Sequence, residues 1–284
     1  TEPASYVAGT GNFYVITRYN WSSYYAMAVI ELGQAVMQAY LQSQSGDYGA
    51  IARDAAAAVS ASEQAGHRPD EGDLLRLADA YQRTNNGAGQ SGALEKLVAY
   101  YPKREYWSVV LGRLPRKPGF ADRLALDVMR LKLATGNLSK TDEFMEMAQL
   151  ALQGGYAAEA KLIVDKGFAS GALGTGAEAD RHKRLRDLAN KQDAEIRANV
   201  EKEITAANAN KDGNALVQIG SVLAAMGQAE QGVSLIEQGI AKGSLKRPDD
   251  AKLRLGLALA QTGKSRTKAQ QTLRSVQGND GAAD

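Results

Sequence analysis

The side chains that most often carry acid–base, nucleophilic or metal chemistry are scarce in this chain. Its 284 residues contain no cysteine and two histidines, His67 and His182. Neither histidine has a second ligand at helical spacing, as a zinc site or a histidine-based triad would need. Glu143 and Glu146 share a helix face, where two solvated carboxylates are expected. We therefore predict no catalytic residue, no metal and no cofactor.

A glycine-rich run and a basic run also invite a functional interpretation. Gly171 to Gly176 lacks the preceding strand and the following Lys-Ser/Thr of a phosphate-binding loop, so a plain loop is expected. The net charge is only +2, from 34 basic and 32 acidic residues, whereas nucleic-acid binders usually show a stronger basic excess. We predict no nucleic-acid partner and assign a solvated helix face to the basic run, Arg181, Lys183, Arg184 and Arg186.

The chain carries no obvious membrane or export signal of its own. No run approaches the roughly 20 apolar residues of a membrane-spanning helix. The sequence starts at Thr1 without methionine or a basic leader, so we expect a processed product or a fragment whose export signal is already gone. A cysteine-free chain tolerates an oxidising compartment well. We predict a periplasmic or otherwise exported bacterial protein.

Aromatic residues are concentrated near the start of the chain. Nine of the 18 lie within the first 48 positions, and the remainder of the chain is rich in alanine. The pattern predicts a loop at Gly9–Asn12, a short strand-like run at Phe13–Thr17 and a helix at Tyr24–Tyr40. The shift in composition predicts two parts, 1–45 and 46–284.

The segment from Tyr6 to Val36 resembles the C-terminal end of membrane-bound lytic murein transglycosylases of the B type. The similarity lies in three runs, Asn12 to Asn20, Ser22 to Val29 and Leu32 to Val36. In that family the first run lines a glycan cleft, where tyrosine rings stack on sugars and Asn or Arg donates to hydroxyl and acetamide oxygens. By position, the resemblance implies a glycan-binding set of Asn12, Phe13, Tyr14, Arg18, Tyr19 and Asn20.

This chain departs from the transglycosylase family in its carboxylates. Those enzymes cleave glycan with one glutamate, acting as acid and then as base, far upstream of the signature. Only Glu2 precedes the signature here. Because cleavage needs a carboxyl group at the leaving oxygen, we expect the segment to be inert. The alternatives are that it packs a helix onto the following helices, forms a glycan site, or ends a longer chain.

A repeated pattern organises the rest of the chain. Gly256 and Gly263 each follow Gly220 and Gly227 by 36 residues, and Ala148 and Gly155 precede the same glycines by 72. Each unit predicts a helix, a tight glycine turn and a second helix, with small residues where the helices touch. Such hairpins bury one face alone and must stack, which predicts an α-solenoid.

Further helices are predicted from periodicity and from turn residues. We expect helices over Ile51–Ala65, Ala93–Tyr101, Tyr106–Leu114, Phe120–Thr135 and Glu178–Asn210, and one that starts at Pro69–Asp73. The long helix carries a single apolar stripe. We expect Asn85–Gly92 to form a flexible turn and Gly278–Asp284 to fray.

From about Ser45 onward the chain resembles tetratricopeptide-repeat proteins, and more narrowly an exported group from proteobacteria. The resemblance lies in Leu-x-x-Ala-x-x-Tyr at Leu75–Tyr81, in Ala93–Trp107, in Lys117–Asp127 and in Arg181–Asp187. It implies an all-α, tetratricopeptide-like solenoid that acts as a non-enzymatic protein- or peptide-binding scaffold of the cell envelope. The alternative is a peptidoglycan-associated protein, and assembly through solenoid ends is a further possibility. Groove candidates are Arg76, Gln82, Gln149, Gln218 and Arg254.

Overall fold

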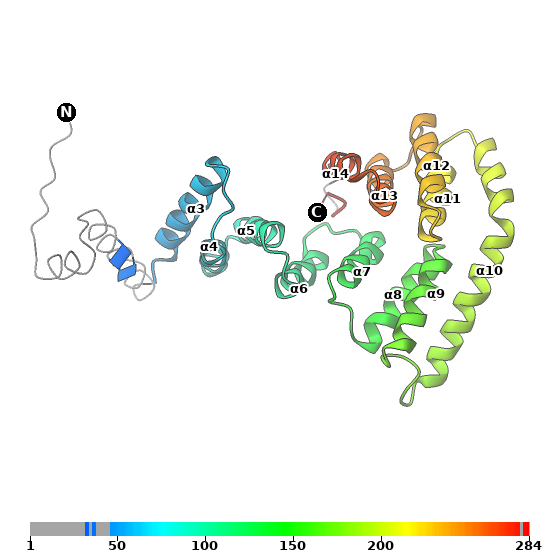
Figure 1. The fold of residues 1–284 in the computed structure, drawn as a ribbon, viewed down its shortest axis with the longest axis horizontal. Helices are drawn as coiled ribbons and strands as arrows, with labels where there is room; N and C mark the ends of the chain where they lie inside the picture. Colours follow the sequence, from blue (N-terminus) through cyan, green and yellow to red (C-terminus); the bar gives the residue numbers. More distant parts are fainter. Residues whose placement is uncertain (1–31, 34–35, 38–45, 279–280, 284) are drawn as a thin grey trace, which may run out of the picture. The chain divides into compact units, whose positions relative to one another are not determined.

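The structure is a computed structural model that describes residues 32–33, 36–37, 46–278 and 281–283 (Figure 1). Within these residues the chain is all-helical, with twelve α-helices, two short 3-10 helices and no strand. This confirms the predicted all-α, solenoid-like helical repeat. The strand-like run and the helix predicted before residue 41 lie almost entirely outside the described residues.

The chain divides into two compact units, residues 1–106 and 107–284. The division falls inside α6 (Arg104–Arg113), and each unit is described by itself below. The domain boundary predicted at residue 45 adjoins residues that the structure does not describe, and it stays a prediction.

The first unit contains α3 (Tyr48–Gln64), α4 (Glu71–Arg83) and α5 (Gly87–Tyr100), with α4 packed against both of the others. Side-chain oxygens of Asp47, Asp70 and Asn86 accept the free N–H groups at the three helix starts. The prediction of a flexible turn over Asn85–Gly92 is wrong, because α5 already begins at Gly87. The Asn86 amide oxygen accepts from the N–H of Gly89 at 2.9 Å, which starts the helix within a glycine-rich run.

The second unit starts at Trp107 within α6, includes all later helices and forms most of the structure. After η1 (Leu114–Arg116) and η2 (Asp122–Leu124), its α-helices are α7 (Ala125–Ala134), α8 (Thr141–Gln153), α9 (Ala157–Ala169), α10 (Ala179–Ala209), α11 (Asn214–Ala225), α12 (Ala229–Lys242), α13 (Pro248–Gln261) and α14 (Arg266–Arg274). Each α-helix from α7 onward packs against the next one. The helix predicted from Phe120 starts five residues later, after Gly119 adopts a left-handed φ of 85°.

One type of turn closes the predicted hairpins. Gly155 and Gly227 have positive φ angles of 79° and 86°, which glycine adopts without a steric penalty. The next N–H then reaches back into the helix: Tyr156 donates to the carbonyl of Ala151, and Gln228 donates to that of Leu223. Gly263 also has positive φ, at 68°. The turn glycines predicted from the 36-residue repeat are therefore confirmed.

Small residues bring α11 and α12 into backbone contact, as the repeat predicted. A Cβ atom on Gly220 would lie 2.7 Å from the carbonyl oxygen of Gly232, and one on Gly232 would lie 2.5 Å from that of Gly220. Gly213 and Gly239 face each other in the same way, with a Cβ on Gly239 2.7 Å from the Gly213 oxygen. We call these four residues the glycine seam.

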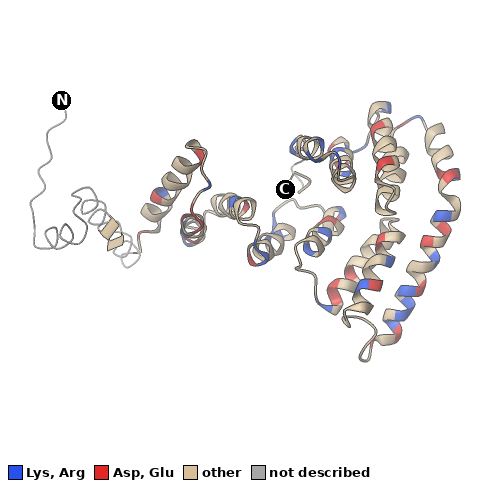
Figure 2. Cartoon of the chain, viewed as in Figure 1, with Lys and Arg blue, Asp and Glu red and all other residues tan. Residues whose placement is uncertain are grey.

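The long helix α10 connects the hairpins of the second unit. Leu185 and Ala189 are buried in one core cluster with α8 and α9, and Ala207 is buried in another with α11. Acidic and basic side chains alternate along the rest of the helix (Figure 2). The predicted apolar stripe of this helix is confirmed at the buried Leu185 and at the half-buried Ile196, Val200 and Ile204, which pack against the two clusters, whereas Leu188 is 44% exposed.

The described residues at the C-terminal end pack back onto the start of the second unit. Ala282 is only 6% exposed and clusters with Leu124 and Val276, next to the half-buried Phe120. The prediction that Gly278–Asp284 frays is therefore wrong for residues 281–283. A small buried methyl group was not recognisable as a core position in a run of Gly, Asn, Asp and Ala.

Candidate binding pocket

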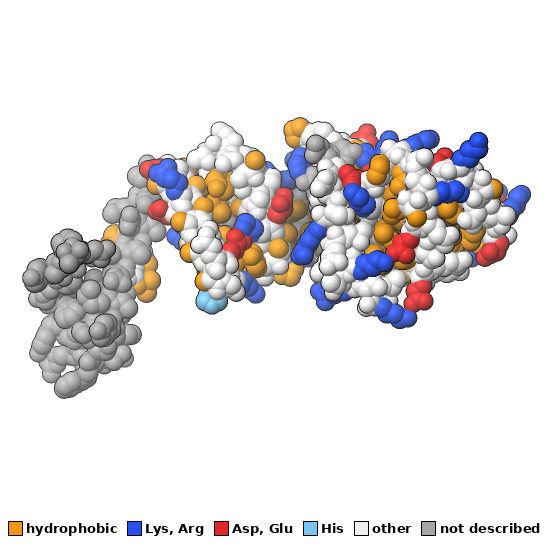
Figure 3. All heavy atoms as spheres, turned by 90° about the horizontal axis from the view of Figure 1, so that it is seen from above, with side chains coloured by type: hydrophobic (Ala, Val, Ile, Leu, Met, Phe, Trp, Pro, Cys, Tyr) orange, Lys and Arg blue, Asp and Glu red, His pale blue; other side chains and the backbone are white. Residues whose placement is uncertain are grey.

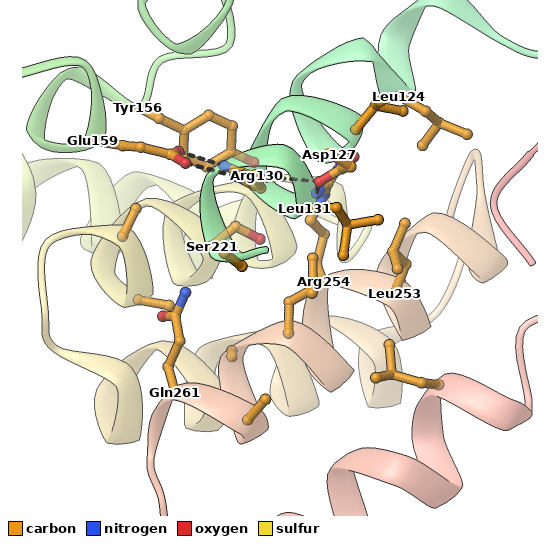
Figure 4. Close-up of a pocket in the computed structure, with 18 of the residues that line it drawn as sticks. Leu124, Asp127, Arg130, Leu131, Tyr156, Glu159, Ser221, Leu253, Arg254 and Gln261 are labelled. Carbon is orange, nitrogen blue, oxygen red and sulfur yellow. Dashed lines mark hydrogen bonds and ion pairs between the residues drawn. The ribbon is translucent and has the colours of Figure 1, made fainter. Parts of the chain in front are cut away.

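The second unit contains a partly open pocket with a volume of about 800 Å³ (Figure 4). Side chains of α7, α9, α11 and α13 line it, together with residues 281–283. A volume of this size falls within the range of sites that hold small molecules or several residues of a peptide. Helices distant in sequence therefore converge on one space.

Most of the pocket wall is apolar, and part of that wall is open to solvent. Leu131 on α7 is 37% exposed and Leu162 on α9 is 63% exposed. Space-filling atoms show apolar strips between charged side chains on one face of this unit (Figure 3). Solvent-exposed leucines in a concave wall are typical of surfaces that bind another molecule.

A chain of four charged side chains crosses the polar part of the pocket wall. The two Arg254 terminal nitrogens donate to the carboxylate of Asp127 at 2.5 and 2.7 Å. Arg130 donates to Asp127 at 2.8 Å and makes a two-point contact with Glu159 at 2.8 and 2.6 Å. The Arg130 guanidinium also lies over the ring of Tyr156, 4.7 Å from its centroid. Figure 4 shows these side chains meeting between α7, α9 and α13.

A second ion pair runs beside this chain and doubles the link between α13 and the η2–α7 segment. Arg123 donates to both carboxylate oxygens of Asp250, at 2.7 and 2.8 Å. Arg123 and Asp127 are four residues apart, as are Asp250 and Arg254. The arginine of each segment therefore pairs with the aspartate of the other. We call Arg123, Asp127, Asp250 and Arg254 the charged seam.

Burial and charge pairing shift the pKa values of these groups in opposite directions, and charge pairing has the larger effect. Burial raises the pKa of Asp127, but the hydrogen bonds and positive charges of Arg254 and Arg130 outweigh it and hold that pKa below its ordinary value. Burial lowers the pKa of Arg130, but the hydrogen bonds and charge of Glu159 and the charge of Asp127 raise it overall. The pKa of Arg254 is raised in the same way by Asp127.

The electrostatics of the pocket favour an uncharged ligand. The two arginines and two carboxylates in its wall cancel in charge, and each is held by a partner. The hydroxyl of Ser221 donates to the carbonyl of Val217 in its own helix. Within the described ranges no group of three or more histidine or carboxylate residues is placed to hold a metal ion.

The groove candidates from the sequence do not converge. Arg254 lines the pocket, whereas Gln149 on α8 and Gln218 on α11 lie in the same unit but not in its lining. Gln218 donates to the carbonyl of Gly154 at 3.0 Å. In the first unit, Arg76 pairs with Asp73, and Gln82 accepts from Gln90 at 2.9 Å. Their role in binding stays a prediction.

Sequence reasoning missed Asp127, Arg130, Tyr156 and Glu159. A usable signal existed in the charge order, since a basic-to-acidic pair four residues apart at 123 and 127 mirrors an acidic-to-basic pair at 250 and 254. Nothing in the local pattern says that these two segments meet.

The glycan-binding set implied by resemblance, Asn12 to Asn20, lies outside the described residues. Comparison with protein families gives one match to this part of the chain. Residues 1–34 are similar to the transglycosylase SLT domain. That match covers 34 of 284 residues and agrees with the transglycosylase resemblance, while the tetratricopeptide resemblance stays a prediction. None of the curated proteins matches the chain. Across the described residues no helix is both long and apolar enough to cross a membrane.

Proposed function

We propose that the chain is a non-enzymatic scaffold of the bacterial cell envelope that binds an apolar segment of a peptide or protein in the pocket of its second unit. The observation that carries this proposal is the open apolar wall, in which Leu131 and Leu162 face solvent beside the pocket. The solenoid-like hairpins supply the frame of the pocket, and glycines with positive φ angles form the turns between the paired helices.

The chemistry of the wall narrows the kind of segment that fits. Because Arg254, Asp127, Arg130 and Glu159 neutralise one another, a charged ligand residue would have to break an existing pair before it gained a new one. An uncharged segment with one or two aliphatic side chains avoids this cost. Burial of two leucine-sized side chains contributes about 3–6 kcal/mol before the entropy of ordering is subtracted.

The test is a selection of peptides on the purified chain, followed by fluorescence anisotropy with the selected peptides. Leu162→Glu and Leu131→Glu should weaken their binding by about thirtyfold, as expected for a central apolar contact worth ~2 kcal/mol. Leu188→Glu is the matched control, since Leu188 is an exposed leucine of the same unit that does not line the pocket. Equal losses in all three variants, or none, would overturn the proposal.

We also propose that the chain does not cleave glycan. Cleavage needs a carboxyl group with a raised pKa at the leaving oxygen, whereas in the pocket wall the pKa of Asp127 is held below its ordinary value and Glu159 is paired with Arg130. Digestion of purified sacculi followed by chromatography of soluble muropeptides tests this. Release of anhydromuropeptides, the cyclised products of a transglycosylase, above the buffer control would show that the chain is an enzyme.

Binding to peptidoglycan is the second candidate function, and the similarity of residues 1–34 to a transglycosylase domain favours it. Asn12, Tyr14 and Asn20 would then contact glycan. Sedimentation with purified sacculi should pellet the chain, and Tyr14→Ala and Asn20→Ala should reduce the pelleted fraction. Equal sedimentation of the three proteins would remove the case for these residues.

A further inference from the structure

Residues close to the C-terminal end of the sequence form one end of the pocket wall. Gly281, Ala282 and Ala283 belong to its lining, at the end where Phe120, Leu124 and Leu253 are found. Figure 4 shows Leu124 and Leu253 together on one side of the pocket, away from Gln261. We call residues 281–283 the strap.

The seat of the strap is matched to its small residues. Gly281 has a φ of 96°, and a Cβ atom on it would lie 2.7 Å from a carbon of the Phe120 ring. Any L-residue at this position would meet both backbone strain and a clash with the ring. Ala282 then buries its methyl group against Leu124 and Val276. The φ angle of Gly281, its close approach to Phe120 and the burial of Ala282 together indicate a specific contact.

We propose that the strap is a resident occupant that competes with the ligand for this end of the pocket. The competition rests on the proposed function, because it presupposes a peptide ligand. The strap itself is an uncharged backbone with small side chains, packed on an aromatic ring and two leucines. A competing ligand must therefore present a similar segment of small uncharged residues, such as Gly and Ala in a turn, at the same place.

The amounts of buried apolar surface favour replacement of the strap by a ligand over a strap that stays bound permanently. The only side chain that the strap buries among its described residues is the methyl group of Ala282, since Ala283 is exposed. A ligand that also reaches Leu131 and Leu162 buries far more apolar surface. The strap thus covers only the end of the pocket at Phe120 and Leu124, and it yields to a ligand with a larger apolar contact.

Two variants release the strap without altering any wall residue of α7, α9, α11 or α13. Gly281→Val introduces the clash with Phe120, and a chain ending at Asp280 removes the strap. Gly176→Val is the matched control, since Gly176 also has positive φ but has no atom within 4 Å of its Cβ position. Circular dichroism identifies any variant that fails to fold, and the shortened chain then replaces Gly281→Val.

The first readout needs no peptide ligand. The dye anilinonaphthalene sulfonate, which fluoresces on apolar surfaces, should brighten with both strap variants and not with Gly176→Val. Adding Leu131→Glu to the shortened chain should abolish the gain, and a synthetic peptide of residues 278–284 should reverse it. No gain in fluorescence, or a gain that the synthetic peptide leaves unchanged, would contradict the proposal that the strap covers this end of the pocket.

The second readout separates the strap from the proposed function. Peptides selected on the full chain should bind the shortened chain about tenfold more tightly, as expected if the strap leaves roughly a tenth of molecules open. Equal affinity for the two chains would overturn the competition while leaving the peptide-binding function intact. If no peptide binds either chain, the proposed function fails, and the dye result still decides whether the strap covers the pocket.

Discussion

The glycine seam and the charged seam hold the second unit together by opposite means. In the glycine seam, side chains are absent, and the backbones of α11 and α12 meet directly. In the charged seam, long side chains span between α13 and the η2–α7 segment, and charge pairs replace close packing. The first contact is fixed by shape alone. The second contact can be weakened by protons, by salt or by loss of one partner, and two of its members, Asp127 and Arg254, lie in the pocket wall.

The difference shows which parts of this unit are fixed and which can change. A backbone contact has no charge to titrate and no long side chain to reorient. Two members of the charged seam, Asp127 and Arg254, line the same pocket as the strap. We therefore expect the α11–α12 hairpin to stay constant while the α7–α13 contact sets how open the pocket is.

Removing the shared carboxylate should give the largest effect. Asp127→Ala leaves Arg254 and Arg130 without the group that neutralises them, and should lower the free energy of unfolding by about 3 kcal/mol. Urea unfolding followed by circular dichroism measures this. Glu230→Ala is the control, because its partner Lys264 and Glu230 itself are largely exposed, and it should change stability little. If the two variants match, the charged seam does not hold the unit together.

Adding one methyl group to the glycine seam should give the next largest effect. Gly239→Ala puts a Cβ 2.7 Å from the Gly213 carbonyl oxygen and should cost about 2 kcal/mol, since only backbone movement relieves the clash. Gly112→Ala in α6 makes the same change where no atom lies within 4 Å, and should gain up to about 1 kcal/mol from helix propensity. A loss of stability in both variants would show that the clash is not the cause.

The two seams also differ in how well sequence predicts them. Gly220 and Gly232 are twelve residues apart in one hairpin, and the same spacing recurs at Ala148 and Ala160, both fully buried. Local repetition therefore revealed the fold, the turn glycines and the contact between paired helices. α5 was misjudged only at its start, because glycine propensity outweighed the Asn86 cap in the prediction.

The pocket could not be predicted from such local signals. Asp127 and Arg254 are 127 residues apart, and their pairing depends on how far the successive hairpins rotate the chain before α13 returns to α7. Small errors in each crossing angle accumulate over that distance. Arg254 was named as a groove residue, but its partners were not. The buried Ala282 likewise depends on this return and has no periodic neighbour to mark it.

Double substitutions sharpen the contrast between the seams. Asp127→Ala and Arg254→Ala share one contact, so their effects should be non-additive by about 1 kcal/mol or more. Asp127→Ala and Gly239→Ala share no partner and should add to within about 0.5 kcal/mol. Urea unfolding of the single and double variants measures both cycles. Strong coupling between Asp127 and Gly239 would mean that the α11–α12 hairpin and the pocket wall respond as one.

The smallest expected effect is on the pH dependence of stability, and it tests the physical origin of each seam. Because the pKa of Asp127 is lower in the folded chain than its unfolded value near 3.9, the unfolded chain binds the proton first as pH falls. The stability that Asp127 contributes is therefore complete above about pH 5 and is lost as pH falls through its folded pKa.

The difference in free energy of unfolding between the wild type and Asp127→Asn should shrink over that range. The difference between the wild type and Gly239→Ala should stay constant, since no titratable group takes part in the glycine contact. A parallel decline for both variants would mean that acid weakens the whole unit uniformly, and the charged seam would then have no special sensitivity to protons.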